Sequence, residues 1–298
     1  MSTSTIAYEG RSPLVARLGD YVELTKPRIA ILELVTLSVA ALLAGIDGWL
    51  LVHALLGTAL VASSASAFNQ WLERHSDAQM PRTAERPLPA GRLGSFEVVL
   101  FGLVTLIAGV AYLTLKVNLL TAGLGLLTWI TYVLVYTPMK YCTPMNTLVG
   151  AVAGALPILM GWTAMGQPLN LEGLTLFLVL FLWQFPHFMS IAWIYRQQYE
   201  AAGMRMLTVV DPSGMRAGAQ AVIVALVLIP VSLVPAVHPL ASSAFVYFAG
   251  ALVLGVGQLM CAVLFLMKRD DASARRLLRA SLVYLPALML LLVLATPL

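Results

Sequence analysis

Three oxygen-bearing side chains stand at four-residue spacing at the start of the most polar stretch of the sequence, residues 68–94: Asn69, Glu73 and Asp77. On a helix these positions fall within an arc of roughly 80° and one turn apart, so they share one face. Two carboxylates at this spacing repel one another. A divalent cation would remove the repulsion, because proteins hold Mg²⁺ with hard oxygen ligands shared with phosphates. Judged by spacing alone, a solvated helix end paired with nearby arginines is an equally good interpretation.

Basic side chains gather around this helix end in three separate segments. "PRTAERPLPAGR" places arginines in a Pro/Gly-broken loop directly after it, "TKPRI" precedes the first apolar run, and "YTPMKYCTPMNT" follows the fourth. Guanidinium and ammonium groups suit phosphate oxygens. The candidate phosphate-binding residues are Lys26, Arg28, Arg82, Arg86, Arg92, Tyr136 and Lys140. Together with the carboxylates they predict a site for a diphosphate, although membrane topology alone also places arginines here.

The elements that must carry these residues are long apolar segments. The chain has 298 residues, 60% of them hydrophobic, and its mean hydropathy is +0.87. A helix of roughly 17 to 25 apolar residues can cross a bilayer. Nine segments qualify: about 29–45, 48–68, 97–115, 117–136, 147–166, 173–194, 217–237, 240–267 and 280–297. Because they are continuous rather than alternating, we predict an all-α polytopic membrane protein.

The basic residues give this membrane protein an orientation. With nine spans, 17 of the 18 Lys and Arg residues fall on one side and only Lys116 falls on the other. Such asymmetry marks the cytoplasmic side. We therefore expect residues 1–28 to be a cytoplasmic N-terminal segment without a signal peptide, and residues 29–298 to form one membrane domain with a periplasmic C-terminus. A bacterial inner membrane is favoured, and the basic composition does not indicate nucleic-acid binding.

A histidine in the sixth apolar segment is a second candidate for ligand binding. "WQFPHF" contains His187 next to Pro186, and a proline inside a helix often produces a kink beside a cavity. An imidazole there could bind a metal ion or hydrogen-bond a carboxylate, with Gln184 and Trp183 lining the same pocket. A lone histidine in a membrane helix is more often bonded to a neighbouring helix, and tryptophans near helix ends also form interfacial belts.

These segments together resemble a known family. "NQWLERHSDAQMPRTAERPLPAGR", "YTPMKYCTPMNTLVGAVAGALPILMGW" and "WQFPHFMSIAWIYRQQYEAAGMRML" are similar to the protohaem IX farnesyltransferases of the intramembrane aromatic prenyltransferase superfamily. The resemblance implies that Asn69, Glu73 and Asp77 hold magnesium diphosphate and that Lys140 and nearby arginines grip its oxygens. The second acidic motif departs from the family pattern, since Gln198 stands where an acid is expected. Either Glu200, the nearest carboxylate, substitutes as the metal ligand, or one carboxylate pair together with the cations is sufficient.

The resemblance also implies a reaction. The enzyme would join the farnesyl group of farnesyl diphosphate to a vinyl group of haem b and add water, giving haem O, in a central cavity open to the cytoplasmic side. His187, Gln184 and Trp183 would then contact haem. A quinone precursor or chlorophyllide is the alternative acceptor. A secondary transporter is disfavoured, because transporters carry ionisable groups at mid-membrane, whereas here the acid inside an apolar segment, Glu33, lies near its cytoplasmic end. A homo-oligomer or a partner enzyme of the haem pathway is compatible with this interpretation.

Overall fold

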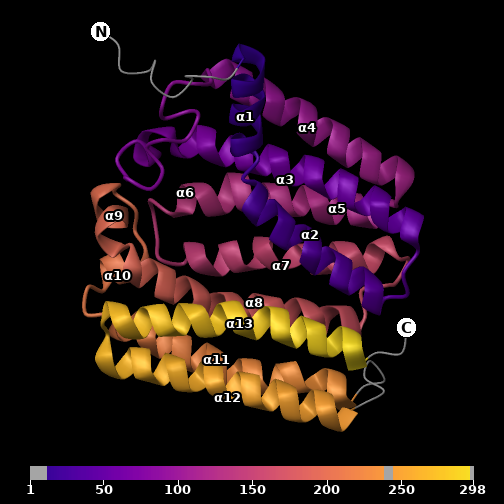
Figure 1. Cartoon of the computed structure of the whole chain (residues 1–298), viewed down its shortest axis with the longest axis vertical. Coiled ribbons are helices and arrows are strands. Elements are labelled where there is room, and N and C mark those ends of the chain that lie inside the picture. Colours follow the sequence, from indigo (N-terminus) through magenta and orange to yellow (C-terminus); the bar gives the residue numbers. More distant parts are fainter. Residues whose placement is uncertain (1–11, 238–243, 296–298) are drawn as a thin grey trace.

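The computed structural model describes residues 12–237 and 244–295, and within them it contains helices and no strand, which confirms the predicted all-α class. The elements, labelled in Figure 1, are α1 (Pro13–Leu24), α2 (Pro27–Leu43), α3 (Gly48–Asp77), α4 (Ser95–Lys116), α5 (Leu119–Trp129), the π-helix η2 (Ile130–Tyr136), α6 (Thr137–Met139), α7 (Asn146–Ala164), α8 (Leu171–Ile194), α9 (Arg196–Ala201), α10 (Leu207–Val210), α11 (Met215–Val237), α12 (Ala244–Lys268) and α13 (Asp271–Ala295).

The long helices confirm a polytopic membrane protein. In the described part of the chain, eight helical stretches are long and apolar enough to cross a membrane. They are α3, α4, α5 continued through η2 and α6, α7, α8, α11, α12 and α13. The remaining predicted span corresponds to α2, whose 17 residues are at the lower limit for crossing a bilayer. The total of nine spans therefore stays a prediction.

Two helices extend beyond their apolar runs. Helix α3 continues past residue 68 to Asp77, so the polar motif stands on a regular helix. Helix α13 begins at Asp271 rather than near residue 280, because Asp270 accepts a hydrogen bond from the backbone N–H of Ser273 and caps the helix start. The predicted loop between the last two spans is therefore mostly helical. Hydropathy marks the part of a helix that lies in lipid, whereas capping side chains decide where the helix begins.

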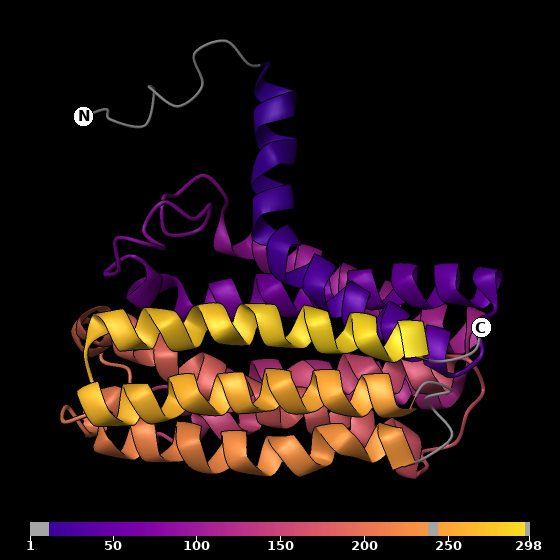
Figure 2. The ribbon, with the colours of Figure 1, turned by 60° about the horizontal axis from the view of Figure 1, so that its bottom comes forward.

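The long helices lie side by side with their axes roughly parallel (Figures 1 and 2). Helix α3 packs on α4, α7 packs on α2, α5 and α8, and α11 packs on α8 and α12, while α13 lies against α8 and α12. The end of α3, the end of α8 and the start of α13 lie at the same end of the bundle (Figure 1). Helix α1 stands across the bundle direction (Figure 2). The polar stretch that follows α3 and the segment that follows α8 thus lie at the same end of the molecule.

The two long connections of the chain, residues 78–94 between α3 and α4 and residues 195–214 between α8 and α11, meet at that end. Met80 of the loop after α3 packs with Met204 and Met206 of the loop after α8. The N–H of Arg205 donates to the carbonyl of Lys140 over 2.6 Å, which joins the second loop to the α6–α7 connection. These contacts cover the polar end of α3 with chain from three distant parts of the sequence.

Glycines of "GAVAG" in α7 allow two predicted site residues to approach this helix closely. A Cβ added at Gly150 would stand 2.7 Å from the Tyr136 ring, and one added at Gly154 would stand 2.3 Å from Oε1 of Gln184. Both distances are far below van der Waals contact. The small residues are therefore used for packing, as their spacing predicts for membrane helices.

Candidate active site

The predicted acidic face is present at the end of α3, and it is buried. Asn69, Glu73 and Asp77 are 1%, 4% and 1% exposed. Their i, i+4, i+8 spacing directs them toward the interior of the protein rather than toward water. Buried carboxylates require charged or hydrogen-bonding partners. The positions of those partners therefore define the site.

Each of the three side chains is bonded to a cation or polar group from another segment. The Lys140 Nζ donates to Oε1 of Glu73 over 2.6 Å. The Arg86 guanidinium donates to Oδ2 of Asp77, also over 2.6 Å. The Lys26 Nζ donates to Oδ1 of Asn69 over 2.5 Å. Three of the predicted cations thus converge on the predicted acidic motif, one from each basic segment.

The π-helix η2 brings two further groups to the motif. Its wider turn is closed by a hydrogen bond from the N–H of Thr137 to the carbonyl of Tyr132. The Thr137 hydroxyl accepts a hydrogen bond of 3.0 Å from the Asn69 amide. The Lys140 Nζ lies 4.6 Å from the centre of the Tyr136 ring, a cation–π contact. Single π-turns inside α-helices are frequent at functional sites, and this one places Thr137 against Asn69 of α3 and Tyr136 beside Lys140.

Lys26 has a backbone conformation that side chains rarely adopt. Its φ of 51° is left-handed, and it links α1 to α2 immediately before Pro27. Such a conformation costs of the order of 1 to 3 kcal/mol and persists where the surroundings impose it. Burial and repulsion from Arg86 lower the pKa of Lys26 to about 7, although Glu73 acts in the opposite direction. Burial thus makes the charge of this amine sensitive to pH near neutrality, unlike that of an ordinary lysine.

The pKa of Lys140 is shifted in the opposite direction from that of Lys26. Burial acts to lower its pKa, but the Glu73 carboxylate more than offsets burial and keeps the pKa of Lys140 well above the usual value. Lys140 is therefore charged throughout the physiological pH range. Near it, burial raises the pKa of Tyr141, whose hydroxyl is 2.5 Å from the Ser76 hydroxyl.

The acidic face fits a magnesium ion shared with a phosphate. The Oδ1 atom of Asp77 is buried and has no hydrogen-bond partner among the described residues, and such an orphan acceptor is costly unless a ligand engages it. No group of three His, Cys, Asp or Glu side chains in the described chain could hold a metal alone. Magnesium needs only one or two carboxylates when substrate phosphates and water complete its shell. Glu73 and Asp77 satisfy this requirement.

Other predicted phosphate-binding residues lie apart from the motif. Arg28 is exposed and makes no hydrogen bond or ion pair within the described chain. Arg92 bonds instead to Asp20 and Glu23, over 2.7 and 2.6 Å, and so fixes α1 to the loop after α3. The Arg82 guanidinium lies 5.0 Å from the centre of the Tyr195 ring. It therefore connects the two long loops.

The predicted fourth metal ligand also stands outside this cluster. Glu200 on α9 is exposed and has no bonded partner in the part of the chain that is described. By contrast, Oε1 of Gln198 is buried without a hydrogen-bond partner there. Gln198 stands where the sequence leads one to expect an acid. The geometry gives Glu200 no support as a metal ligand, and its role stays a prediction.

The residues of "WQFPHF" lie on α8, and their side chains bond to two different neighbouring helices. The Nδ1 atom of His187 is 2.9 Å from the Ser281 hydroxyl of α13, and the His187 ring stacks on Trp183 with ring centres 4.8 Å apart. The Trp183 indole N–H donates to the Ser281 carbonyl over 2.8 Å. Gln184 instead donates to the Ala151 carbonyl of α7 over 2.8 Å. These contacts account for all three residues structurally, so haem contact stays a prediction.

Sequence reasoning missed the residues that hold the site together. Thr137 and Tyr141 lie in the quoted "YTPMKYCTPMNT" segment but were not expected to contact α3. Their position within three residues of Lys140 in the sequence is the feature that could have indicated these contacts. Ser281, the partner of His187, lies 94 positions away, and no feature of the sequence indicated their contact.

Fold and site together define a class of protein: an all-α membrane protein whose buried carboxylates and converging cations, at one end of the bundle, suit a diphosphate. The chain belongs to the UbiA prenyltransferase family, which it matches over residues 34–292. It is therefore a prenyltransferase, and the family resemblance found in the sequence is confirmed.

Individual relatives extend this result. A protein from Solibacter usitatus (strain Ellin6076) named protoheme IX farnesyltransferase is 45% identical over 292 residues, which cover 94% of this chain and 99% of that protein. The solved structure of a digeranylgeranylglyceryl phosphate synthase has a TM-score of 0.80 at 16% identity, covering 94% of this chain and 98% of its own. A UbiA homologue from Archaeoglobus fulgidus bound to GPP and Mg²⁺ has a TM-score of 0.64 at 15% identity, covering 92% and 99%. The two structures show that the fold is shared.

Proposed function

We propose that this prenyltransferase transfers the farnesyl group of farnesyl diphosphate to a vinyl group of haem b, with addition of water, and so makes haem O. The observation that carries the proposal is the pair of buried carboxylates at the end of α3, Glu73 and Asp77, each bonded to a cation. The likeness to the Solibacter protein over almost the whole chain supports farnesyl diphosphate and haem b as the substrates.

In this proposal the cations bind the diphosphate. Lys140, Arg86 and Lys26 already stand at the acidic motif, and their ammonium and guanidinium groups would turn to phosphate oxygens when the substrate enters. Tyr136 supports the Lys140 ammonium through its ring. Stabilising the negative charge that develops on the leaving diphosphate lowers the barrier to breaking the allylic C–O bond. Arg82 and Arg28 lie farther out and would guide the anionic substrate inward.

Magnesium is the proposed cofactor, and Asn69, Glu73 and Asp77 would hold it. When bound, it would neutralise charge on the carboxylates and on the diphosphate. Asp77 has a free buried oxygen for this purpose. The Archaeoglobus structure, bound to GPP and Mg²⁺, supports a metal-dependent site in a protein of this fold.

The apolar helices would keep water away from the reacting carbon atoms after the diphosphate has left. Loss of diphosphate leaves an allylic cation, which survives only where water is kept away. A carbon of the haem vinyl group then forms the new C–C bond. The hydroxyl of one water molecule adds to the other vinyl carbon, and its proton is released. His187, with Trp183 and Gln184, is the proposed haem contact, and Ser281 fixes the orientation of its imidazole.

We further propose that the site faces the cytoplasm of a bacterial cell and that residues 29–298 form the membrane domain. The basic asymmetry of the chain supports this orientation. The cytoplasm supplies the water-soluble diphosphate end of the substrate to the end of α3. Residues 1–28 would be cytoplasmic as well, and the C-terminus periplasmic.

Product identification tests the proposed function. Membranes containing the protein are incubated with haem b, magnesium and labelled farnesyl diphosphate, and the pigments are separated and identified by mass. Label in a haem that carries one farnesyl group and one water is expected. Labelled product from a quinone precursor or a chlorophyllide, with none from haem b, would move the assignment to the alternative acceptor.

A further inference from the structure

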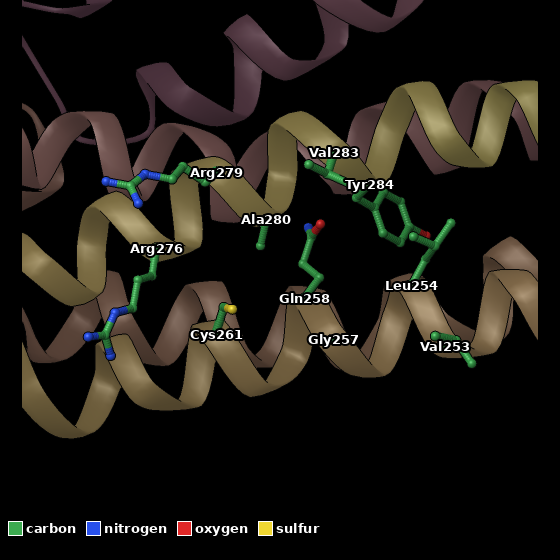
Figure 3. A pocket seen from close by; sticks show the side chains of 10 residues that line it. All are labelled: Val253, Leu254, Gly257, Gln258, Cys261, Arg276, Arg279, Ala280, Val283 and Tyr284. Atoms are coloured by element: carbon green, nitrogen blue, oxygen red, sulfur yellow. The ribbon is translucent and has the colours of Figure 1, made fainter.

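A groove between α12 and α13 lies outside the proposed active site. It has a volume of about 460 Å³, within the usual range of small-molecule sites. Residues that line it include Leu254, Gly257, Gln258, Cys261, Arg276 and Arg279, as Figure 3 shows. Neither the reaction nor the acidic motif of α3 uses any of them.

The polarity of the lining changes in one direction along the groove. Arg276 and Arg279 stand near the start of α13, at the end of the bundle where the basic residues gather. Cys261 and Gln258 follow on α12, with Cα atoms about 4.5 Å apart along the helix axis. Beyond them the lining is mainly apolar, with Val253, Leu254 and Val283, and it includes the polar hydroxyl of Tyr284. The groove is therefore cationic at the membrane surface, polar below it and apolar toward the bilayer interior.

Gln258 provides an independent sign of a ligand. Its side chain is 2% exposed, and neither its Nε2 nor its Oε1 has a hydrogen-bond partner in the described part of the chain. Figure 3 shows this side chain reaching from α12 toward α13. A buried amide without partners is costly, and the bilayer core offers no water to satisfy it. A group with hydrogen-bonding atoms at this depth would remove the cost.

The two arginines are available for an anion. The guanidinium groups of Arg276 and Arg279 are exposed and make no ion pair or hydrogen bond within residues 12–237 and 244–295. Hydrogen bonds from Ser273 lower the pKa of Asp270, and the charge of Arg276 contributes to this shift. Asp270, the acid on the α12–α13 turn, bonds to Ser273 and caps α13. Positive-inside topology explains why arginines stand on this side of the membrane. It does not explain why two of them flank the groove that contains an unpartnered glutamine.

We propose that the α12–α13 groove is a binding site for one anionic glycerophospholipid. Its phosphate would bind Arg276 and Arg279, because guanidinium groups pair well with phosphate oxygens. An ester carbonyl, which lies below the phosphate in such a lipid, accepts a hydrogen bond from Nε2 of Gln258. The acyl chain lies over Gly257 and Leu254. The lipid's order of charge, ester and hydrocarbon matches the order of the lining.

Native mass spectrometry of the full-length protein in detergent tests this site. The protein is titrated with phosphatidylglycerol and, separately, with phosphatidylcholine of the same acyl chains. The wild type is expected to bind phosphatidylglycerol at least about tenfold more tightly, because the choline ammonium of phosphatidylcholine offsets the phosphate charge and is repelled by the two guanidinium groups. The double variant Arg276→Gln/Arg279→Gln is expected to lose that preference. The control Arg275→Gln, an exposed arginine of the same helix that does not line the groove, is expected to keep it.

A second variant fills the groove without changing its charge. A Cβ added at Gly257 meets no atom within 4 Å, so the side chain of Gly257→Leu starts in open space beside the groove, and thermal unfolding of the variant checks that the helices still pack. It is expected to weaken binding of both lipids. Equal affinity of the wild type for the two lipids would overturn the proposal, as would an equal loss in Arg275→Gln. Tighter binding of haem b or farnesyl diphosphate, removed by the same double variant, would assign the groove to a substrate instead.

Discussion

Lys140 and Glu73 are 67 positions apart in the sequence, and their side chains are joined by a hydrogen bond of 2.6 Å. Lys140 follows the span that contains the π-helix, and Glu73 stands on the last turns of α3. A buried carboxylate without this ammonium would be strongly disfavoured. The ammonium therefore stabilises the buried carboxylate, and it places a permanently charged donor where a diphosphate would arrive.

Removing either carboxylate charge should disable the enzyme. Glu73→Gln and Asp77→Asn are each expected to lower turnover by about 10²- to 10³-fold at saturating magnesium, because the lost group acts on charge that develops in the transition state. Steady-state assays with labelled farnesyl diphosphate measure the effect. Glu85→Gln, in the exposed part of the same polar stretch, is the matched control. Near-normal turnover in Glu73→Gln would show that this carboxylate has a structural role and does not act in catalysis.

Farnesyl diphosphate binding should depend on pH through Lys26. With a pKa of about 7, Lys26 is mostly charged at pH 6 and mostly neutral at pH 8. Because the anionic ligand favours the charged form, affinity should fall by up to about tenfold between these values, and binding at pH 7.5 should take up a proton. Calorimetry in buffers of different ionisation enthalpy measures that uptake. In Lys26→Met the uptake should vanish, whereas unchanged uptake would point to another group.

The magnesium requirement should distinguish Glu200 from Gln198. Glu200 is exposed, so Glu200→Gln is expected to leave the magnesium concentration at half-maximal activity unchanged. Gln198 has a buried, unpartnered oxygen, and Gln198→Asp is expected to lower that concentration by adding a carboxylate. Magnesium titrations of both variants beside the wild type decide the matter. A higher requirement in Glu200→Gln would restore Glu200 as the metal ligand that the sequence predicts.

His187 should affect haem and not the diphosphate. His187→Ala is expected to weaken haem binding, followed by absorbance, while farnesyl diphosphate affinity measured by calorimetry stays nearly the same. His53→Ala is the control, because His53 is also half-buried and bonded to another helix, through the Tyr112 hydroxyl at 2.8 Å. If haem affinity, spectrum and turnover are all unchanged in His187→Ala, the bond to Ser281 is the whole role of this histidine.

Reporter fusions should place residues 85 and 298 on opposite sides of the membrane. A fusion at Glu85 is expected to report the cytoplasm and one at Leu298, which lies outside the described residues, the periplasm. The reason is the 17-to-1 distribution of basic residues over nine spans. Of the eight helices in the described chain that can cross a membrane, seven lie between the two fusion points, so a cytoplasmic signal from both fusions would contradict this odd number of crossings and with it the nine-span topology.

The sequence by itself determined the elements and the chemistry they carry. Apolar runs long enough for a bilayer specified the helices, since a span needs a minimum length of hydrocarbon-compatible residues. The spacing of Asn69, Glu73 and Asp77 specified a common face, because rise and rotation per residue are fixed in an α-helix. Both inferences are local, and the structure agrees with them.

Only the tertiary structure decided which side chains meet. Lys26 and Arg28 are two residues apart, yet Lys26 alone bonds to Asn69, because its left-handed backbone conformation turns the chain at that point. Lys140 meets Glu73 because η2 and α3 lie against one another, and His187 meets Ser281 because α8 packs on α13. Contacts between helices depend on packing across the whole bundle, and residue spacing within one helix carries no information about them.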